Sequence, residues 1–137
     1  MHSRVIQVTT GARPAVVDVT AECRRFLVEV AAGDGLLHLF VPHATAGLAL
    51  VETGAGTEAD LLAAVDALLP ADPGRWGHRH GTPGHGRDHV LPAFVAPYAS
   101  LPVVGGQLAL GTWQSVVVVD PNRDNSVRRL RLSFLPG

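Results

Sequence analysis

The sequence contains only one cysteine, Cys23, among its 137 residues, and it contains no lysine. One cysteine cannot form a disulfide within the chain, and scarce cysteine is typical of proteins from a reducing compartment. Arginine supplies all 11 basic residues, which nearly balance 12 acidic ones and leave a formal net charge of -1. A net charge so close to zero argues against binding to nucleic acid or to a membrane surface.

Long apolar runs are also missing from the sequence. None approaches the ~20 residues that a helix needs to cross a bilayer. Residues 1–4 lead into an alternating segment rather than into the apolar stretch of a signal peptide. We therefore expect a cytoplasmic protein with no membrane partner. Hydrophobic residues still make up 47% of the chain, which is enough to build the core of a single domain over residues 1–137.

Hydrophobic periodicity predicts two helices. Residues 21–32 carry apolar side chains at helical spacing, with Thr20 as a candidate N-cap and Gly33 just after the last turn. Cys23 falls on the apolar face of this helix, which indicates a core residue rather than a reactive thiol. Residues 57–69 begin with a Thr-Glu-Ala-Asp capping box, carry a stripe of leucine and valine, and end before Pro70.

Alternating or continuous apolar segments predict seven or eight strands. The segments are 4–9, 15–19, 35–41, 47–52, 101–104, 107–110, 115–119 and 127–135. We expect the first two to form a hairpin, and Gly105-Gly106 to turn between two later strands. The valine run within 115–119 is typical of a strand buried on both faces. With the two helices, these strands predict an α+β fold built on a mostly antiparallel sheet or sandwich.

Residues 41–52, with the sequence VPHATAGLALVE, place polar and turn-forming residues between two predicted buried strands. Side chains inserted at the end of a sheet often build functional sites. His43 is therefore the first candidate for a catalytic or metal-binding residue.

Residues 71–89 show no periodicity, and a loop this long in a compact domain is usually either functional or disordered. It holds four histidines within twelve positions: His78, His80, His85 and His89. This concentration favours metal ligation or acid–base chemistry. Alternate residues of an extended segment share a face, so His78 and His80 could bind one metal together with His43. Exposed polar roles remain equally open for His80 and His85.

Arginines alternate with these histidines at positions 75, 79 and 87. Arginine is well suited to bidentate contacts with phosphate, although arginines in a loop also serve simply to keep it solvated. The sequence has no GxxxxGK[ST], GxGxxG, HExxH, CxxC or GxSxG motif, so the common nucleotide-binding, zinc and serine-hydrolase signatures do not apply.

Several blocks of the sequence, taken in order, resemble the YjbQ-like family, which is described as secondary thiamine-phosphate synthases. The matching blocks are residues 39–47 (LFVPHATAG), Glu52, Asp60-Leu61-Leu62, Trp76-Gly77-His78, residues 84–90, Leu101-Pro102-Val103 and residues 106–114 (GQLALGTWQ). The likeness covers nearly the full chain. The PHATAG and LGTWQ blocks in this order make it specific.

The resemblance implies an α+β fold, a homotrimer and a polar site. Matched by position, the implied site residues are His43, Thr45, His78, His89, Trp113 and Gln114, with Glu52, Asp60 and Asp120 as acidic partners. His43 and His89 would act as acid–base groups or metal ligands, and His78 would complete a three-histidine site for a divalent ion, zinc or magnesium. Glu52 or Asp60 would orient an imidazole. Arg79 and Arg87 would neutralise the charge of a phosphorylated substrate.

The loop departs from the family's pattern at two positions. The family usually has Gly-Asn-Ala-Asp-Ala-His where this chain reads Gly84-His85-Gly86-Arg87-Asp88-His89. His85 therefore stands in place of an asparagine, and Arg87 in place of an aspartate. Asp88 would restore the carboxylate only if the loop shifts by one residue.

Three functional hypotheses follow. The first is an enzyme that joins a hydroxymethylpyrimidine pyrophosphate to a thiazole phosphate and releases pyrophosphate, as the resemblance implies. The second is a metal-dependent hydrolase that uses a zinc-bound water on the same three histidines and loses activity on chelation. The third is a non-catalytic module that binds a metal or an anionic metabolite and turns over nothing.

Overall fold

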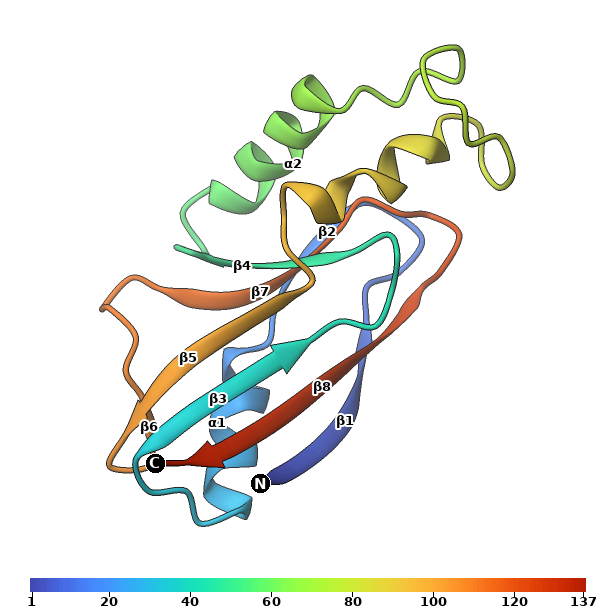
Figure 1. The fold of residues 1–137 in the computed structure, drawn as a ribbon. Coiled ribbons are helices and arrows are strands. Elements are labelled where there is room, and N and C mark those ends of the chain that lie inside the picture. The colour runs from blue at the N-terminus through green and yellow to red at the C-terminus, as the bar shows by residue number, and fades with distance from the viewer.

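The computed structural model describes residues 1–137. Eight strands form two antiparallel sheets, and two α-helices and two short 3-10 helices accompany them (Figure 1). The predicted α+β architecture is therefore confirmed. Neither α-helix has the length and apolar character that a membrane crossing requires.

The larger sheet has the strand order β1-β8-β3-β5-β6. Its strands are β1 (His2–Thr9), β8 (Val127–Pro136), β3 (Gly35–Phe40), β5 (Tyr98–Val104) and β6 (Gln107–Leu108). The smaller sheet has the order β2-β7-β4. It consists of β2 (Ala15–Asp18), β7 (Ser115–Asp120) and β4 (Gly47–Val51).

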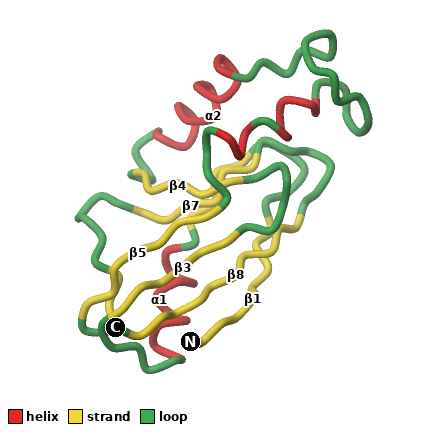
Figure 2. Tube along the Cα trace, in the orientation of Figure 1, coloured by secondary structure: helices red, strands yellow, loops and turns green.

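The helices cover different parts of these sheets. Helix α1 (Thr20–Glu29) packs Cys23, Phe26 and Leu27 into the main core, while α2 (Thr57–Leu68) contributes to a second cluster on the smaller sheet. The 3-10 helices η1 (His85–His89) and η2 (Leu91–Ala93) follow a loop that extends beyond α2 (Figure 2). Burial raises the pKa of the Cys23 thiol to about 12, in agreement with its predicted role in the core.

Strand β7 joins the two hydrophobic clusters. Val116 and Val118 belong to the main core, whereas Val117 and Val119 pack in the second cluster with residues of α2 and η2. All four valines are fully buried. The valine run is therefore buried on both faces, as predicted, because successive strand residues point to opposite sides.

The predicted hairpin between the first two strands is wrong. β1 pairs with β8 in the larger sheet, and β2 pairs with β7 in the smaller one. The turn at residues 11–14 therefore carries the chain from one sheet to the other. Hydrophobic alternation identifies both strands but cannot reveal that their partners lie about a hundred residues or more away in the sequence.

Both predicted helices form, but their ends differ in detail. α2 begins after Gly56, whose φ is 95°, and has no side-chain cap; the Glu58 carboxylate instead accepts a hydrogen bond from the Gly54 N–H. Thr20 is the first residue of α1, and Asp18 accepts its backbone N–H at 2.9 Å. Of the predicted apolar stripe, Leu68 is 56% exposed, because only one narrow side of α2 rests on the smaller sheet.

Candidate functional site

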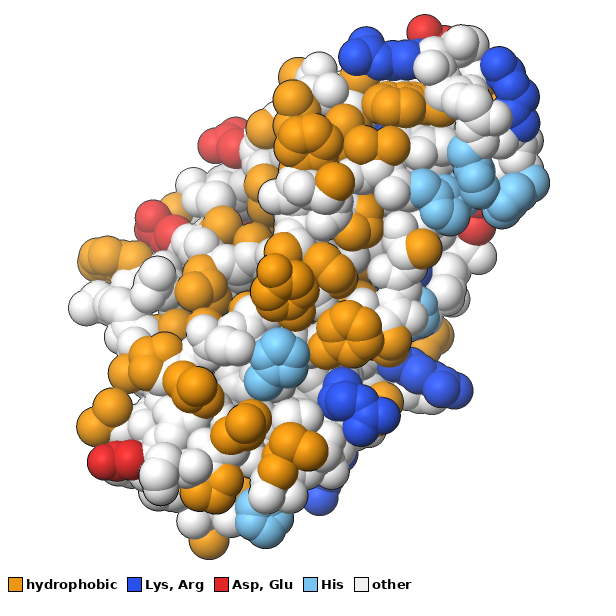
Figure 3. Space-filling model, viewed as in Figure 1, with side chains coloured by type: hydrophobic (Ala, Val, Ile, Leu, Met, Phe, Trp, Pro, Cys, Tyr) orange, Lys and Arg blue, Asp and Glu red, His pale blue; other side chains and the backbone are white.

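The four histidines of the loop lie against one another. His78 and His80 come from the loop itself, while η1 places His85 and His89 at its two ends. The centroids of all six pairs of rings are 3.9–6.1 Å apart. Histidine side chains gather visibly on the surface over this loop (Figure 3). The four loop histidines therefore form one cluster in the folded chain.

His85 is the best-connected ring of the cluster. Its Nε2 lies 2.8 Å from Nε2 of His89, so one ring must donate an N–H hydrogen bond to the other. Its Nδ1 lies 2.8 Å from the amide nitrogen of Asn122, 3.2 Å from Asp124 and 3.4 Å from Asp88. These contacts hold the ring in one orientation.

His78 has a ring nitrogen, Nε2, that is buried and has no hydrogen-bond partner. Burial lowers the pKa of His78, and the neighbouring His80 and His85 lower it further. Burial also lowers the pKa of His89, as does the proximity of His78 and His85. Both imidazoles are therefore neutral at pH 7, which is the form that binds metals and accepts protons.

A hollow of about 380 Å³ extends from this cluster to the residues around His43. Its lining comprises His43, Ala44, Thr45, His80, Gly81, His85, His89, Asn122, Asp124, Asn125 and Arg128. Three connections thus meet here: the one between β3 and β4, the loop after α2, and the turn between β7 and β8. His43 Nε2 accepts the backbone N–H of Arg129 at 2.8 Å, and burial followed by the charge of Arg128 lowers its pKa.

Arg128 lines the hollow, and the sequence analysis did not predict it as a site residue. It is 2% exposed, and its Nε and Nη2 donate to the two carboxylate oxygens of Asp120 at 2.7 and 2.9 Å. Nη2 also donates to Thr45 Oγ1 at 2.8 Å. The sequence did carry a signal: along β8, Arg128 shares the buried alternate positions with Leu130 and Leu132.

Arg87 is held within the protein rather than presented to the hollow. Only 4% exposed, it donates from Nε to Asp88 at 2.9 Å and from Nη1 to the Leu69 carbonyl at 3.1 Å. Nη1 also contacts the exposed carboxylate of Asp66 at 2.5 Å. Only Nη2 remains for a ligand. Asp88, whose pKa burial raises, lies behind His85, so a carboxylate does stand next to the loop histidines.

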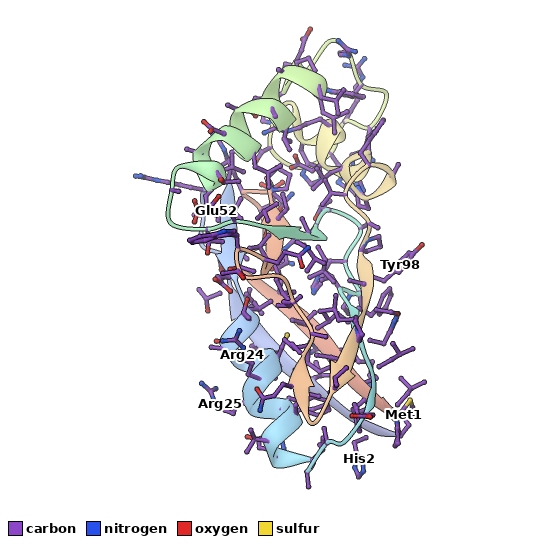
Figure 4. The ribbon with its side chains drawn as sticks, turned by 90° about the vertical axis from the view of Figure 1, so that its left-hand side faces the viewer. Met1, His2, Arg24, Arg25, Glu52 and Tyr98 are labelled. Atoms are coloured by element: carbon purple, nitrogen blue, oxygen red, sulfur yellow. The ribbon has the colours of Figure 1, made fainter.

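The other predicted site residues lie elsewhere in the chain. Arg79 is exposed near His78 and His80 and donates to the Pro73 carbonyl at 3.1 Å. Glu52 follows the far end of β4 (Figure 4), and Asp60 is exposed in the first turn of α2.

The GTWQ block also lies outside the histidine hollow. Trp113 is 72% exposed, and Gln114 lines a separate polar hollow with Asp18 and Ser115. Within one chain, therefore, the hollow is lined by His43, Thr45, His80, His85 and His89. His78 reaches it only through its contacts with the other loop histidines, and Glu52, Asp60, Trp113 and Gln114 do not line it.

Comparison with known proteins identifies relatives over the whole chain. A family model described as "UPF0047 protein YjbQ-like" matches residues 4–137. A UPF0047 protein of Mycobacterium tuberculosis is 54% identical over 137 residues, which cover 100% of both chains. The UPF0047 protein YugU of Bacillus subtilis is 30% identical over 117 residues, covering 82% of this chain and 84% of that protein.

Solved structures agree with this likeness. A hypothetical protein of Aeropyrum pernix superposes with a TM-score of 0.90 and 30% identity, and the match covers 100% of both chains. A YbjQ-like protein of unknown function from Sulfolobus solfataricus has a TM-score of 0.88 at 23% identity, covering 99% of this chain and 97% of that chain. At this identity the second likeness shows the fold alone.

Proposed function

The chain belongs to the UPF0047 family of YjbQ-like proteins, and on that premise we propose that its histidine-lined hollow is the catalytic site of a small enzyme acting on a phosphorylated or pyrophosphorylated metabolite. One observation carries the proposal: the hollow brings His43 and Thr45 together with His85 and His89 from the loop. Histidine side chains that line one polar hollow can accept and return protons during a reaction.

His43 and His89 are the proposed acid–base pair. The pKa of each is lowered by burial, so each is neutral at pH 7. Because Nε2 of His43 accepts the Arg129 N–H, Nδ1 of His43 carries the proton and can donate it to a substrate. The Thr45 hydroxyl, fixed by Arg128, supplies a polar contact for the substrate. Arg79 lies on the exposed loop next to the histidines, where a phosphate could reach it, whereas Arg87 has only one free nitrogen.

The metal that we propose for this site would be held by His43, His78 and His89. His78 and His89 support it, since their ring centroids are 4.0 Å apart and His78 has an unpartnered buried nitrogen. Imidazole nitrogens suit zinc, whereas magnesium prefers oxygen ligands. A bound zinc ion would supply a Lewis acid for the departing phosphate oxygen.

The reaction that the family resemblance suggests is the joining of a hydroxymethylpyrimidine pyrophosphate to a thiazole phosphate. In that reaction His43 or His89 would give a proton to the released pyrophosphate, and Arg79 would balance part of its charge. We also propose that the protein is a homotrimer. A second subunit would then offer Glu52, Asp60, Trp113 and Gln114 a place near the hollow that the single chain does not give them.

The outer face of the larger sheet supports the proposal of subunit contact. It carries Phe40, 40% exposed, and Tyr98, 59% exposed, on neighbouring strands. Light scattering should then give three times the 14.4 kDa of the chain. A monomer would contradict the homotrimer.

Metal-dependent hydrolysis is the second candidate function. The unpartnered nitrogen of His78 favours it, because a metal bound there would carry a water activated for attack. This enzyme would release phosphate from a single substrate and would stop on chelation. Binding of the same metabolites without any turnover would instead identify a non-catalytic module.

The test is a release assay for pyrophosphate and phosphate with both proposed substrates, with each substrate alone, and with chelator. Release of pyrophosphate only when both are present supports the synthase, and H43Q or H89Q should lower its rate by about 10²–10⁴-fold. His38→Gln, on β3 and hydrogen-bonded to Ser100, is the matched control and should retain full activity. Full activity in both H43Q and H89Q would overturn the proposed site.

A further inference from the structure

Two histidines of the cluster have no acid–base or metal-binding role in the proposed reaction. His80 and His85 each offer a ring nitrogen that lies within 4.8 Å of the others in a group completed by His78. We propose that His78, His80 and His85 form a binding site for a zinc-type transition-metal ion, built within the loop itself. This ligand set shares His78 with the trio of His43, His78 and His89, so the two sets are alternatives for one ion, and binding at this one requires no catalysis.

The distances suit a metal after a small closure. Zinc–nitrogen bonds of 2.0–2.1 Å at tetrahedral angles place ligand nitrogens about 3.4 Å apart. Ring nitrogens within 4.8 Å of one another therefore need to approach by at most about 1.4 Å. His78 and His80 belong to the irregular segment between α2 and η1, so rotation of their side chains can supply this movement.

His78 supplies an independent reason to expect a ligand. Its Nε2 is buried yet accepts and donates no hydrogen bond. A buried polar atom without a partner is unfavourable, because it has lost water and gained nothing in return. The centroid of its ring lies 3.9 Å from that of His80, with the two rings inclined at 62°, so the second proposed ligand is its nearest aromatic neighbour in the cluster.

Two carboxylates lie where a metal-bound His85 could place the proton of its other ring nitrogen. A ligating histidine usually gives its other ring N–H to a carboxylate, which fixes the ring and strengthens its donor nitrogen. Nδ1 of His85 accepts the Asn122 amide at 2.8 Å, and it also lies 3.2 Å from Asp124 and 3.4 Å from Asp88. On metal binding through Nε2, Nδ1 would carry a proton and would donate it to one of these carboxylates instead. The Asp124 carboxylate accepts one hydrogen bond from the Thr82 hydroxyl and another, at 3.1 Å, from the backbone N–H of Thr82.

Nε2 of His85 would then be the metal ligand. Nε2 lies 2.8 Å from Nε2 of His89, and metal binding at His85 would replace this hydrogen bond. The fourth position is left to water or to a ligand from the adjoining hollow. Three imidazoles form a borderline donor set that suits Zn²⁺, Co²⁺ and Ni²⁺ rather than Mg²⁺ or Ca²⁺.

The experiment is a titration of the chelator-stripped full-length protein with Zn²⁺ by calorimetry, and with Co²⁺ followed by its visible absorption. We expect one ion per chain and the absorption of tetrahedral cobalt. His80→Ala and His85→Asn should each weaken binding at least tenfold, and Asp124→Asn about 10–100-fold through its effect on His85. His2→Ala, at an exposed histidine near the opposite end of the molecule (Figure 4), is the matched control and should bind normally.

Zn²⁺ titrations of further variants, made without substrate, distinguish this metal site from the trio of His43, His78 and His89. His43→Ala should leave Zn²⁺ affinity unchanged. Loss of affinity in His43→Ala with normal binding in His80→Ala would overturn the inference in favour of the other trio. Absence of stoichiometric binding in the wild type would also overturn it. His80 is exposed, so its variant should fold, and circular dichroism in chelator verifies this.

Discussion

At the scale of single residues, two buried arginines form ion pairs that stabilise the segments around the site. Arg128 pairs with Asp120 beneath the hollow, and Arg87 pairs with Asp88 behind the histidines. Each neutralises a carboxylate that would otherwise be buried without an arginine partner, which is costly. The motif-based interpretation assigned Arg87 to the substrate, whereas its contacts indicate that it ties η1 to the end of α2.

Arg87→Ala should therefore lower the free energy of unfolding by about 3 kcal/mol, because Asp88 keeps only its hydrogen bond from Asn122 and loses the arginine charge, and the Leu69 carbonyl loses its arginine donor. Urea denaturation at pH 7 measures the change. Arg79→Ala, an exposed arginine of the same loop, is the control and should change stability by less than about 0.5 kcal/mol. If Arg87→Ala keeps full stability and weakens phosphate binding, Arg87 binds the substrate rather than stabilising the fold.

At the scale of elements, the start of β4 depends on close contact with the segment after η2. The Leu48 N–H donates to the Ala96 carbonyl at 2.8 Å. A Cβ on Gly47 would lie 2.1 Å from the carbonyl oxygen of Val95. This contact sets where the connection carrying His43 and Thr45 enters the smaller sheet.

Gly47→Ala should destabilise the protein by about 2–3 kcal/mol, because the added methyl group forces the two segments apart. Thermal unfolding followed by circular dichroism measures the effect. Gly33→Ala is the matched control: nothing lies within 4 Å of its added Cβ, so its unfolding temperature should stay close to that of the wild type. Equal unfolding temperatures for both variants would refute the close-contact explanation.

At the scale of the whole molecule, the cluster makes stability depend on pH. The pKa values of His43, His78 and His89 are lowered from 6.5 in the folded chain, chiefly by burial. The unfolded chain therefore binds protons more readily between pH 6.5 and the lowered values. The contribution of these neutral histidines to the free energy of unfolding is therefore fully present above pH 6.5, and it is lost as the pH falls below 6.5.

Chelator-treated protein should accordingly show a falling free energy of unfolding as the pH is lowered from 7.5 to 5.5. This window lies above the ordinary pKa of 3.8 of Asp124, whose lowered value acts only in stronger acid. Urea denaturation at several pH values gives the curve, and His89→Gln should flatten it while His2→Gln does not. A curve that stays level between these pH values would contradict the prediction.

Local patterns predicted most of the elements and only part of the site. The strands and both helices follow from hydrophobic period and turn residues, which act over a few positions. The motif around His43 and the histidine-rich loop were recognisable for the same reason. Arg128 and Asn122 were missed, because their importance lies in what they contact across the fold.

The sequence by itself determined the class of fold, the positions of its elements and the family, since each depends on short-range pattern or on ordered motifs. Only the tertiary structure decided that β1 pairs with β8, that four imidazoles face one another, and that Glu52 and Trp113 lie away from them. Strand pairing and the convergence of side chains depend on packing between distant segments, and hydrophobic period carries no information about which distant segments will meet.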